Sequence, residues 1–356
     1  MENIGKHNKK SKPLRIVLIT LGALLLIGII MGLCFFIKLN GMRKGSTGIV
    51  QQEHTPEPVP TPETTLVPVL DESGLDLTED YDPELDPGDI SDDPIYSQNR
   101  IDPNVINIFM LGDDARDASD HGRTDSMMLV SYNKQTRRVK LVSFLRDTWI
   151  YIPGRSNWNR INAAYMFGGV GLAINTVNTN FDLDIQYYMR VDFNALKRIT
   201  DTLGGIELEL TLSEVEYINS KCASAQLPEE AGRHHLNGEQ TLIHARNRKL
   251  GNGDWSRTER QRAIMMAFLK RAQQERDAAS LMKLVNELAE FVETNMTPLQ
   301  LVSLAVDVVL GGSLEIKSRP LPFEGTWKYA WEGRMAVIHI DIEKNKQLLH
   351  NYLYGE

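Results

Sequence analysis

The sequence of 356 residues contains only two cysteines, Cys34 and Cys222. Cys34 lies inside a long apolar run and Cys222 lies far downstream, so we expect no internal disulfide. No cysteine–histidine spacing typical of a zinc site is present. The G-x-S-x-G, H-E-x-x-H and G-x-x-x-x-G-K-[ST] motifs are also missing, which argues against a serine-hydrolase elbow, a zinc protease and a nucleotide-binding P-loop.

The sequence also has fewer basic than acidic residues. The chain has 39 Lys and Arg residues against 47 Asp and Glu residues, for a formal net charge of −8. A protein whose main partner is nucleic acid needs a basic surface to meet the phosphates. The composition therefore predicts no nucleic-acid partner, although a local basic patch stays open.

One short stretch departs from this acidic background. Residues 242–262 (LIHARNRKLGNGDWSRTERQR) hold six Lys and Arg residues and only two acids, Asp254 and Glu259. Ser256 with Glu259 three positions later matches a capping box and predicts a helix over about residues 257–276. A helix N-terminus favours anions. If the preceding turn folds back, four guanidinium groups converge there, those of Arg246, Arg248, Arg257 and Arg260.

The N-terminal part of the chain predicts a membrane anchor. Residues 16–37 form an uncharged apolar run long enough to span a bilayer, longer than the apolar region of a signal peptide. Five Lys and Arg residues precede it and three follow, so we expect residues 1–15 in the cytoplasm and the rest outside the cell. Residues 38–100 are rich in proline and acid, which predicts an extended extracellular linker.

From about residue 101 the hydrophobic pattern becomes that of a folded domain. Short apolar runs alternate with helical patterns up to residue 345, which predicts an α/β domain with helices on both faces of a sheet. Residues 346–356 are expected to form a C-terminal tail. We expect strands at residues 105–112, 126–133, 138–147, 186–191 and 205–210 (GIELEL), with a hairpin at residues 134–137 (KQTR). The expected helices include residues 162–180 and a segment from Asp192 to the Gly204–Gly205 pair.

Acidic and basic residues flank the ends of three of these strands. They are, in chain order, Asp114 and Arg116, Arg123 and Asp125, and Arg146 and Asp147. Guanidinium groups match phosphate oxygens, and carboxylates hold Mg²⁺ while phosphates supply its other ligands. The pattern therefore predicts a site for pyrophosphate and Mg²⁺ at one sheet edge. The alternative is that each Asp–Arg pair is a surface salt bridge, which contributes only ~0–1 kcal/mol to stability.

The domain resembles the LytR-CpsA-Psr family of bacterial cell-wall proteins. Six motifs carry the resemblance in the order in which the family has them, over roughly residues 104–262: NIFMLGDDAR, GRTDSM, SFLRDT, RINAAYMFGG, LGGIELEL and LNGEQTLIHARNRKLGNGDWSRTERQR. Residues 319–341 (RPLPFEG to MAVIHID) are similar to the end of the family's domain. Leu145 stands where the family commonly has proline, and His244 where it commonly has tyrosine.

The resemblance implies a mixed central sheet between helices and a phosphotransferase of a Gram-positive type bacterium. Such an enzyme moves a glycopolymer phosphate from a polyprenyl-pyrophosphate carrier in the membrane to peptidoglycan, with Mg²⁺ as cofactor. The glycopolymer is left open between teichoic acid, capsule and other anionic polymers.

The resemblance also suggests a role for individual residues. Asp114 and Asp125 would hold the metal, and Asp125 or Asp147 would take the proton of the attacking hydroxyl. The pyrophosphate clamp would comprise Arg116, Arg123, Arg146, Arg246, Arg248, Arg257 and Arg260, with Gln261 lining the same site. Candidates for a prenyl pocket between sheet and helices are Met127, Met128, Phe144, Tyr165 and Phe167, for each of which an ordinary core position is the alternative.

Three other functions stay open. A protein that captures the lipid carrier or an anionic polymer without turnover would need the arginines but not the acids. A pyrophosphatase would use the same site with water as the acceptor. A transmembrane regulator is disfavoured, because residues 1–15 are too few to form a DNA-binding domain.

Overall fold

The computed structural model describes residues 49–50, 93–96, 99–113, 124–155, 157–274 and 291–355. The predicted membrane segment and most of the predicted linker lie outside these residues. No helix in the described ranges has both the length and the apolar character that a bilayer crossing requires.

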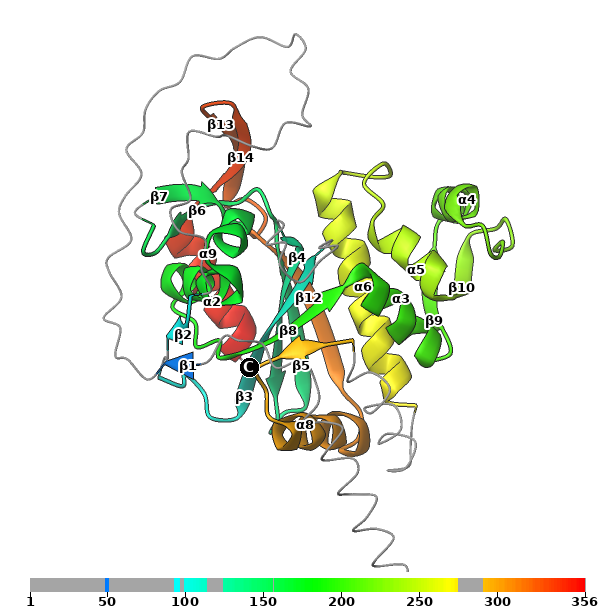
Figure 1. Cartoon of the computed structure of the whole chain (residues 1–356), viewed down its shortest axis with the longest axis horizontal. Helices are drawn as coiled ribbons and strands as arrows, with labels where there is room; N and C mark the ends of the chain where they lie inside the picture. Colours follow the sequence, from blue (N-terminus) through cyan, green and yellow to red (C-terminus); the bar gives the residue numbers. More distant parts are fainter. Residues whose placement is uncertain are drawn as a thin grey trace, which may run out of the picture. The chain divides into compact units, whose positions relative to one another are not determined.

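The centre of the domain is a six-stranded mixed sheet with the order β11–β8–β3–β4–β5–β12 (Figure 1). The strands are β3 (Val105–Asp113), β4 (Thr124–Asn133), β5 (Arg138–Phe144), β8 (Tyr187–Asp192), β11 (Glu293–Thr294) and β12 (Glu315–Leu321). β3 and β5 are antiparallel to β4, whereas β8 runs parallel to β3 and β12 parallel to β5. The predicted mixed sheet is confirmed.

Local sequence signals account for several of these elements. The turn between β4 and β5 contains Arg137 with a positive φ of 55°, so the expected hairpin at KQTR is confirmed. Helix α3 (Phe193–Thr202) begins where predicted, because Asp192 Oδ1 accepts a hydrogen bond from the Ala195 N–H at 2.6 Å.

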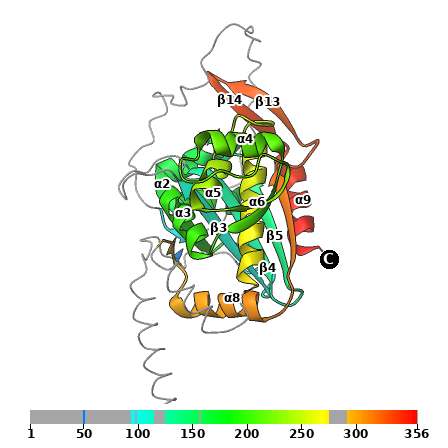
Figure 2. The same ribbon diagram turned by 90° about the vertical axis from the view of Figure 1, so that its right-hand side faces the viewer.

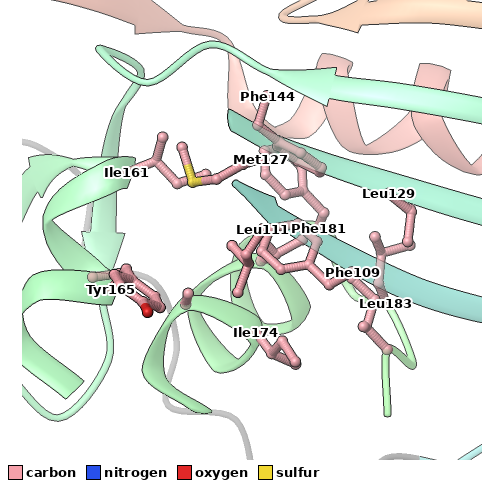
Figure 3. Close-up of a cluster of buried hydrophobic side chains, with 14 of the residues drawn as sticks. Phe109, Leu111, Met127, Leu129, Phe144, Ile161, Tyr165, Ile174, Phe181 and Leu183 are labelled. Atoms are coloured by element: carbon pink, nitrogen blue, oxygen red, sulfur yellow. The ribbon is translucent and has the colours of Figure 1, made fainter. Parts of the chain in front are cut away.

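One face of the sheet is covered by α2 (Ile161–Phe181) and α9 (Ile342–Tyr354) (Figure 1). Between them and the sheet lies the main hydrophobic core, part of which is drawn in Figure 3. The rings of Phe109, Phe144 and Phe181 pack in sequence, with centroids 5.8 and 5.9 Å apart. Aromatic pairs at such distances stabilise a core beyond the area they bury.

The packed domain extends past both predicted boundaries. Strand β2 (Ile95–Tyr96) lies against α2, and Ile95 is fully buried. The chain passes so close to α2 that a Cβ on Gly171 would lie 1.6 Å from the Asp93 carbonyl oxygen. At the other end, the segment expected as a tail belongs to α9, because Leu349 and Leu353, four residues apart, both face the core.

The opposite face of the sheet is covered by α3, α5 (Gly238–Ala245) and α6 (Asp254–Ala272), with α8 (Pro298–Leu310) at one end (Figure 2). A small lobe adjoins α5 and α6 with its own hydrophobic cluster, and it consists of α4 (Leu212–Lys221), β9 (Ile206–Leu210) and β10 (Gly232–Leu236). The expected strand at GIELEL is β9, but it pairs with β10 rather than with the central sheet.

Two β-hairpins complete the described domain. They are β6–β7 (Trp149–Ile152 and Asn157–Arg160) and β13–β14 (Trp327–Glu332 and Met335–Ile340). A further pair joins β1 (Ile49–Val50) to β2.

Candidate active site

The ends of three central strands meet at one edge of the sheet, as the sequence predicts. Asp113 at the end of β3 is opposite Thr124 at the start of β4, and Met127 is opposite Phe144 at the end of β5. The segments that follow β3, precede β4 and follow β5 therefore begin at the same edge. Arg146 comes two residues after β5, at this edge.

Asp254, the first residue of α6, joins three arginines from separate parts of the chain. Its Oδ2 lies 2.6 Å from Arg146 Nε, and its Oδ1 lies 3.2 Å from Arg257 Nη2 and 3.6 Å from Arg248 Nε. The Asp254 side chain is 17% exposed, so these pairs are partly shielded from water. Three of the predicted clamp residues thus converge at the N-terminus of α6.

A second carboxylate extends this cluster. Asp147 Oδ1 lies 3.7 Å from Arg146 Nε and 3.5 Å from Arg160 Nε. Arg160 also donates to the Ala336 carbonyl oxygen from Nη2 at 2.7 Å, which connects the cluster to the β13–β14 hairpin. Among these six groups there are four guanidiniums and two carboxylates. The surplus positive charge at a helix N-terminus suits a multiply charged anion.

The turn before α6 folds back, although not through the predicted capping box. Helix α6 begins at Asp254 after Gly253, which has a positive φ of 53° and no side chain to cap the helix. Ser256 lies inside the first turn, and its Oγ accepts from the Asn252 N–H at 2.7 Å. The prediction of a start near Arg257 was therefore wrong by one turn. The earlier start puts Asp254 at the positive end of the helix dipole, where a carboxylate is stabilised.

Gly251 is needed at the tip of this turn for two reasons. Its φ is +80°, a left-handed conformation that other residues rarely adopt, and an added Cβ would lie 2.3 Å from Ser256 Oγ. The tight tip holds Arg248 on one side of the turn near Arg257 on the other.

Arg260 does not belong to the cluster around Asp254. Its Nε is 2.8 Å from Glu214 Oε1, and its terminal nitrogens donate to the carbonyl oxygens of Asn247 and Leu250 at 3.1 and 3.0 Å. The side chain is 9% exposed. Arg260 therefore stabilises the turn before α6 through these contacts and is not available to bind an anion.

His244 supports the same turn from within α5. The pKa of His244 is lowered to about 4, mainly by burial, with Glu214 opposing the shift and Arg260 adding to it. The imidazole is 3% exposed and is therefore neutral at physiological pH. His244 thus packs behind the turn and does not add charge to the site.

Arg246, the residue that ends α5, contacts the wall of an apolar cavity. Its guanidinium lies over the ring of Phe193, 4.5 Å from the centroid, a cation–π contact. Phe193 and Gln261 line a cavity of about 300 Å³ between the sheet and helices α3 and α6. Its other walls are mainly apolar and include Met110, Met128, Met189, Ile199, Met265 and Phe268.

Only one of the five residues predicted to line a prenyl pocket lies on this cavity. Met128 lines it, as expected. Met127, Phe144, Tyr165 and Phe167 instead belong to the packed core on the other face of the sheet, and Figure 3 shows the first three among their neighbours there. The reason is the alternation of side chains along a strand, which sends Met127 and Met128 to opposite faces.

The remaining predicted residues are the metal ligands Asp114 and Asp125 and the clamp residues Arg116 and Arg123. Asp114, Arg116 and Arg123 lie outside the described residues, and only the backbone of Asp125, in β4, is described. Within the described ranges, no group of three or more His, Cys, Asp or Glu residues is arranged to hold a metal ion. Beside Asp125, the hydroxyl of Thr124 is buried without a hydrogen-bond partner among the described residues. A buried hydroxyl without a partner among the described residues is an oxygen donor of the kind that Mg²⁺ prefers.

Two residues of the cluster were missed as site residues at the level of sequence. Asp254 was noticed only as an exception in a basic stretch, and its position directly after two close glycines was the available signal. Arg160 directly precedes α2 in the motif RINAAYMFGG, and nothing in the local pattern shows that it meets Asp147.

Solved structures share this architecture. The crystal structure of TagV from Bacillus subtilis superposes with a TM-score of 0.58 at 25% identity, covering 71% of this chain and 98% of TagV. The B. subtilis protein YwtF (TagT), solved with bound octaprenyl pyrophosphate lipid, superposes with a TM-score of 0.56 at 21% identity, covering 72% of this chain and 93% of TagT.

Sequence comparison gives a consistent result. A Bacillus mycoides protein named polyisoprenyl-teichoic acid–peptidoglycan teichoic acid transferase TagU is 32% identical over 200 residues, which are 56% of this chain and 63% of TagU. The chain thus spans less than two thirds of the length of this curated relative. The sequence profile of the LytR_cpsA_psr family matches residues 85–350, most of the chain. The motifs occur in order, the sheet and helices are in place, and the match covers about three quarters of the sequence, so the chain belongs to the LytR_cpsA_psr family.

Proposed function

We propose that this protein is a phosphotransferase that moves a glycopolymer phosphate from a polyprenyl-pyrophosphate carrier to peptidoglycan. The observation that carries the proposal is the arginine cluster around Asp254 together with an apolar cavity, on whose wall Phe193 lies under the guanidinium of Arg246. A lipid pyrophosphate has the matching two parts, a multiply charged head and an apolar chain. The relative TagU is named as a transferase of this type, and the TagT structure holds octaprenyl pyrophosphate.

In the proposed mechanism, Arg146, Arg248 and Arg257 hold the pyrophosphate oxygens while the prenyl chain enters the cavity. A hydroxyl oxygen of peptidoglycan attacks the phosphorus nearer the glycopolymer and forms a new P–O bond. The P–O bond to the prenyl phosphate breaks, and the prenyl phosphate leaves with the electron pair. The arginines stabilise the negative charge that develops on the leaving group, which is the main contribution expected of such a preorganised site.

The hydroxyl proton goes to a carboxylate. Asp147 is already held by Arg146 and Arg160, so we assign it the positioning of these two arginines. This leaves Asp125 as the better candidate for the base. Mg²⁺, when bound by Asp114 and Asp125 with the Thr124 hydroxyl nearby, would neutralise part of the pyrophosphate charge. Asp125 would act either as the base or as a ligand of Mg²⁺, and these two roles are alternatives.

The membrane location is part of the proposal. An anchor at residues 16–37 with the domain outside the cell would place the cavity where a lipid-linked substrate resides. A fusion of a periplasm-type reporter enzyme to residue 356 tests the orientation, because such a reporter is active only outside the cytoplasm.

The activity is tested with the full chain in detergent, a prenyl-pyrophosphate-linked sugar, Mg²⁺ and soluble peptidoglycan oligomers, with products followed by mass spectrometry. We expect a phosphodiester-linked product that Arg246→Ala abolishes. Arg233→Ala is the matched control, because Arg233 is an exposed arginine on β10 of the adjacent lobe. Free sugar phosphate without linked product would show a pyrophosphatase, and lipid binding without turnover would show a capture protein.

A further inference from the structure

The β13–β14 hairpin carries exposed aromatic side chains that the proposed reaction does not use. Trp327, Tyr329 and Trp331 alternate along β13 and therefore lie on one face of the hairpin. Tyr329 is 64% exposed and Trp331 is 47% exposed, unusual values for such large apolar rings. Trp255 from α6 joins the same face. We name these four side chains the aromatic platform.

The platform is held in a defined shape by its own contacts. The ring centroids of Trp255 and Trp327 are 4.8 Å apart, and those of Trp327 and Tyr329 are 5.0 Å apart with the rings nearly perpendicular. Trp255 Nε1 donates to the Tyr329 hydroxyl oxygen at 3.0 Å. On the other face of the hairpin, His339 stacks on Trp149 of β6 at an interplanar angle of 2°. The rings of Trp255, Trp327 and Tyr329 are therefore positioned in advance of any ligand, and Trp331 extends their face along β13.

The platform is continuous with the arginine cluster. Trp255 directly follows Asp254, the carboxylate that joins three arginines. The Ile338 N–H donates to the Asp147 carbonyl oxygen at 2.8 Å, and Arg160 donates to the Ala336 carbonyl oxygen. The hairpin thus hydrogen-bonds to the segment that presents Arg146 and Asp147, and a ligand lying on the platform would be next to the pyrophosphate site.

We propose that the aromatic platform binds pyranose rings of the acceptor glycan strand beside the transferred phosphate. The C–H groups on one face of a pyranose ring are apolar and carry partial positive charge, which complements the negative face of an aromatic ring. This inference rests on the proposed transferase function, because it assigns the acceptor side of that site. It adds a binding surface for sugar outside the arginine cluster and the cavity.

A membrane surface is the other candidate occupant, because tryptophan and tyrosine also collect at lipid interfaces. The tip of the hairpin argues against it. Glu332, Gly333 and Arg334 form the tip, and Glu332 is 2.7 Å from His339 Nε2. Placing these polar groups in lipid would cost free energy, whereas a hydroxyl-rich glycan leaves them in water.

The test measures sugar binding separately from transfer. The full chain in detergent is titrated with chitotetraose, a soluble N-acetylglucosamine tetramer, and binding is followed by tryptophan fluorescence and saturation-transfer NMR. We expect Tyr329→Ala and Trp331→Ala each to weaken binding by about threefold to tenfold. Tyr329→Phe keeps the ring and loses only the hydrogen bond from Trp255, so it should bind more tightly than Tyr329→Ala does. Leu299→Ala is the matched control, because Leu299 is 74% exposed on α8, outside the platform.

Three outcomes would overturn the proposal. The first is the absence of chitotetraose binding by the parent protein, and the second is binding of chitotetraose by the two alanine variants as tight as that of the parent protein. The third outcome is quenching of tryptophan fluorescence by brominated lipids in nanodiscs that is lost in Trp331→Ala, which would show that the platform contacts lipid. Failure of the transferase proposal looks different, since the parent protein would then bind chitotetraose without making a linked product. If both proposals hold, Trp331→Ala raises the KM for the peptidoglycan acceptor and leaves the binding of prenyl pyrophosphate unchanged.

Discussion

Neighbouring residues of β4 enter two different environments on the two faces of the central sheet. Met127 joins Phe109, Phe144 and Phe181 in a core closed by α2 and α9. Met128, one position later, lines the cavity under α3 and α6. The first face is filled by interlocking rings, whereas the second is lined largely by flexible aliphatic and methionine side chains. Unfilled apolar space lowers the stability of a protein, so the closely packed face contributes most of the stability. The face with the cavity, the open face, gives up part of that stability and has room for a ligand.

The largest expected effect compares phenylalanine on the two faces. Phe144→Ala should lower the free energy of unfolding by about 3–5 kcal/mol, because it removes a ring that is only 1% exposed. Phe268→Ala should cost much less, since Phe268 lines existing empty space. Chemical denaturation of both variants measures the difference. Equal losses of unfolding free energy in the two variants would show that the cavity around Phe268 is filled in solution.

The next effect concerns the charged end of the open face. Asp254→Ala should reduce transfer by roughly a hundredfold, because three arginines lose the carboxylate that positions them. Steady-state kinetics of the full chain measures this. Glu259→Ala is the control, since Glu259 is an exposed acid on the same helix. A variant with normal turnover would show that the arginines are positioned without Asp254.

A third comparison uses the adjacent methionines. Met127→Trp should destabilise the protein by roughly 1–3 kcal/mol through overpacking of the closed core. Met128→Trp should be tolerated more easily, since the indole has the cavity of about 300 Å³ to enter. The same variant should weaken binding of geranylgeranyl pyrophosphate, measured by calorimetry. Unchanged binding would separate the cavity from the prenyl chain.

The smallest expected effect is a pH dependence of the folding stability, caused by the buried His244. The pKa of His244 is about 4 in the folded protein and about 6.5 when unfolded, so only the unfolded chain gains this proton as the pH falls between these values. Stability is therefore complete above about pH 6.5 and is lost on acidification, by on the order of 1 kcal/mol between about pH 7 and pH 5.5. His244→Tyr should flatten this part of the stability profile. An identical slope in both proteins would assign the loss to other groups.

Much of the fold was predictable from local patterns. The strand at residues 105–112 was visible as an apolar run, and the start of α3 was visible in Asp192, whose side chain caps the helix by itself. The start of α6 was predicted one turn late. A serine followed by a glutamate normally marks the first turn, but Gly253 allowed the chain to enter the helix earlier.

The candidate site was predictable as a set of residue types and less so as an arrangement. Arg248 and Arg257 do converge, but Arg260 from the same stretch pairs with Glu214 of the small lobe, a partner that lies 46 positions away in the sequence. The prenyl-pocket candidates were chosen as large apolar residues, and most proved to be core. Hydrophobicity is the same on both faces of a sheet, so it does not say which face remains open.

The sequence by itself determined the elements, the family and the concentration of arginine near residue 250, since these depend on residue type and short spacing. Only the tertiary structure decided that Asp254 would join arginines separated by more than 100 positions, that the cavity would open under α6, and that the aromatic hairpin would adjoin the site. The physical reason is that charge pairing and packing act through space, and distance through space is set when the sheet brings its strand ends together.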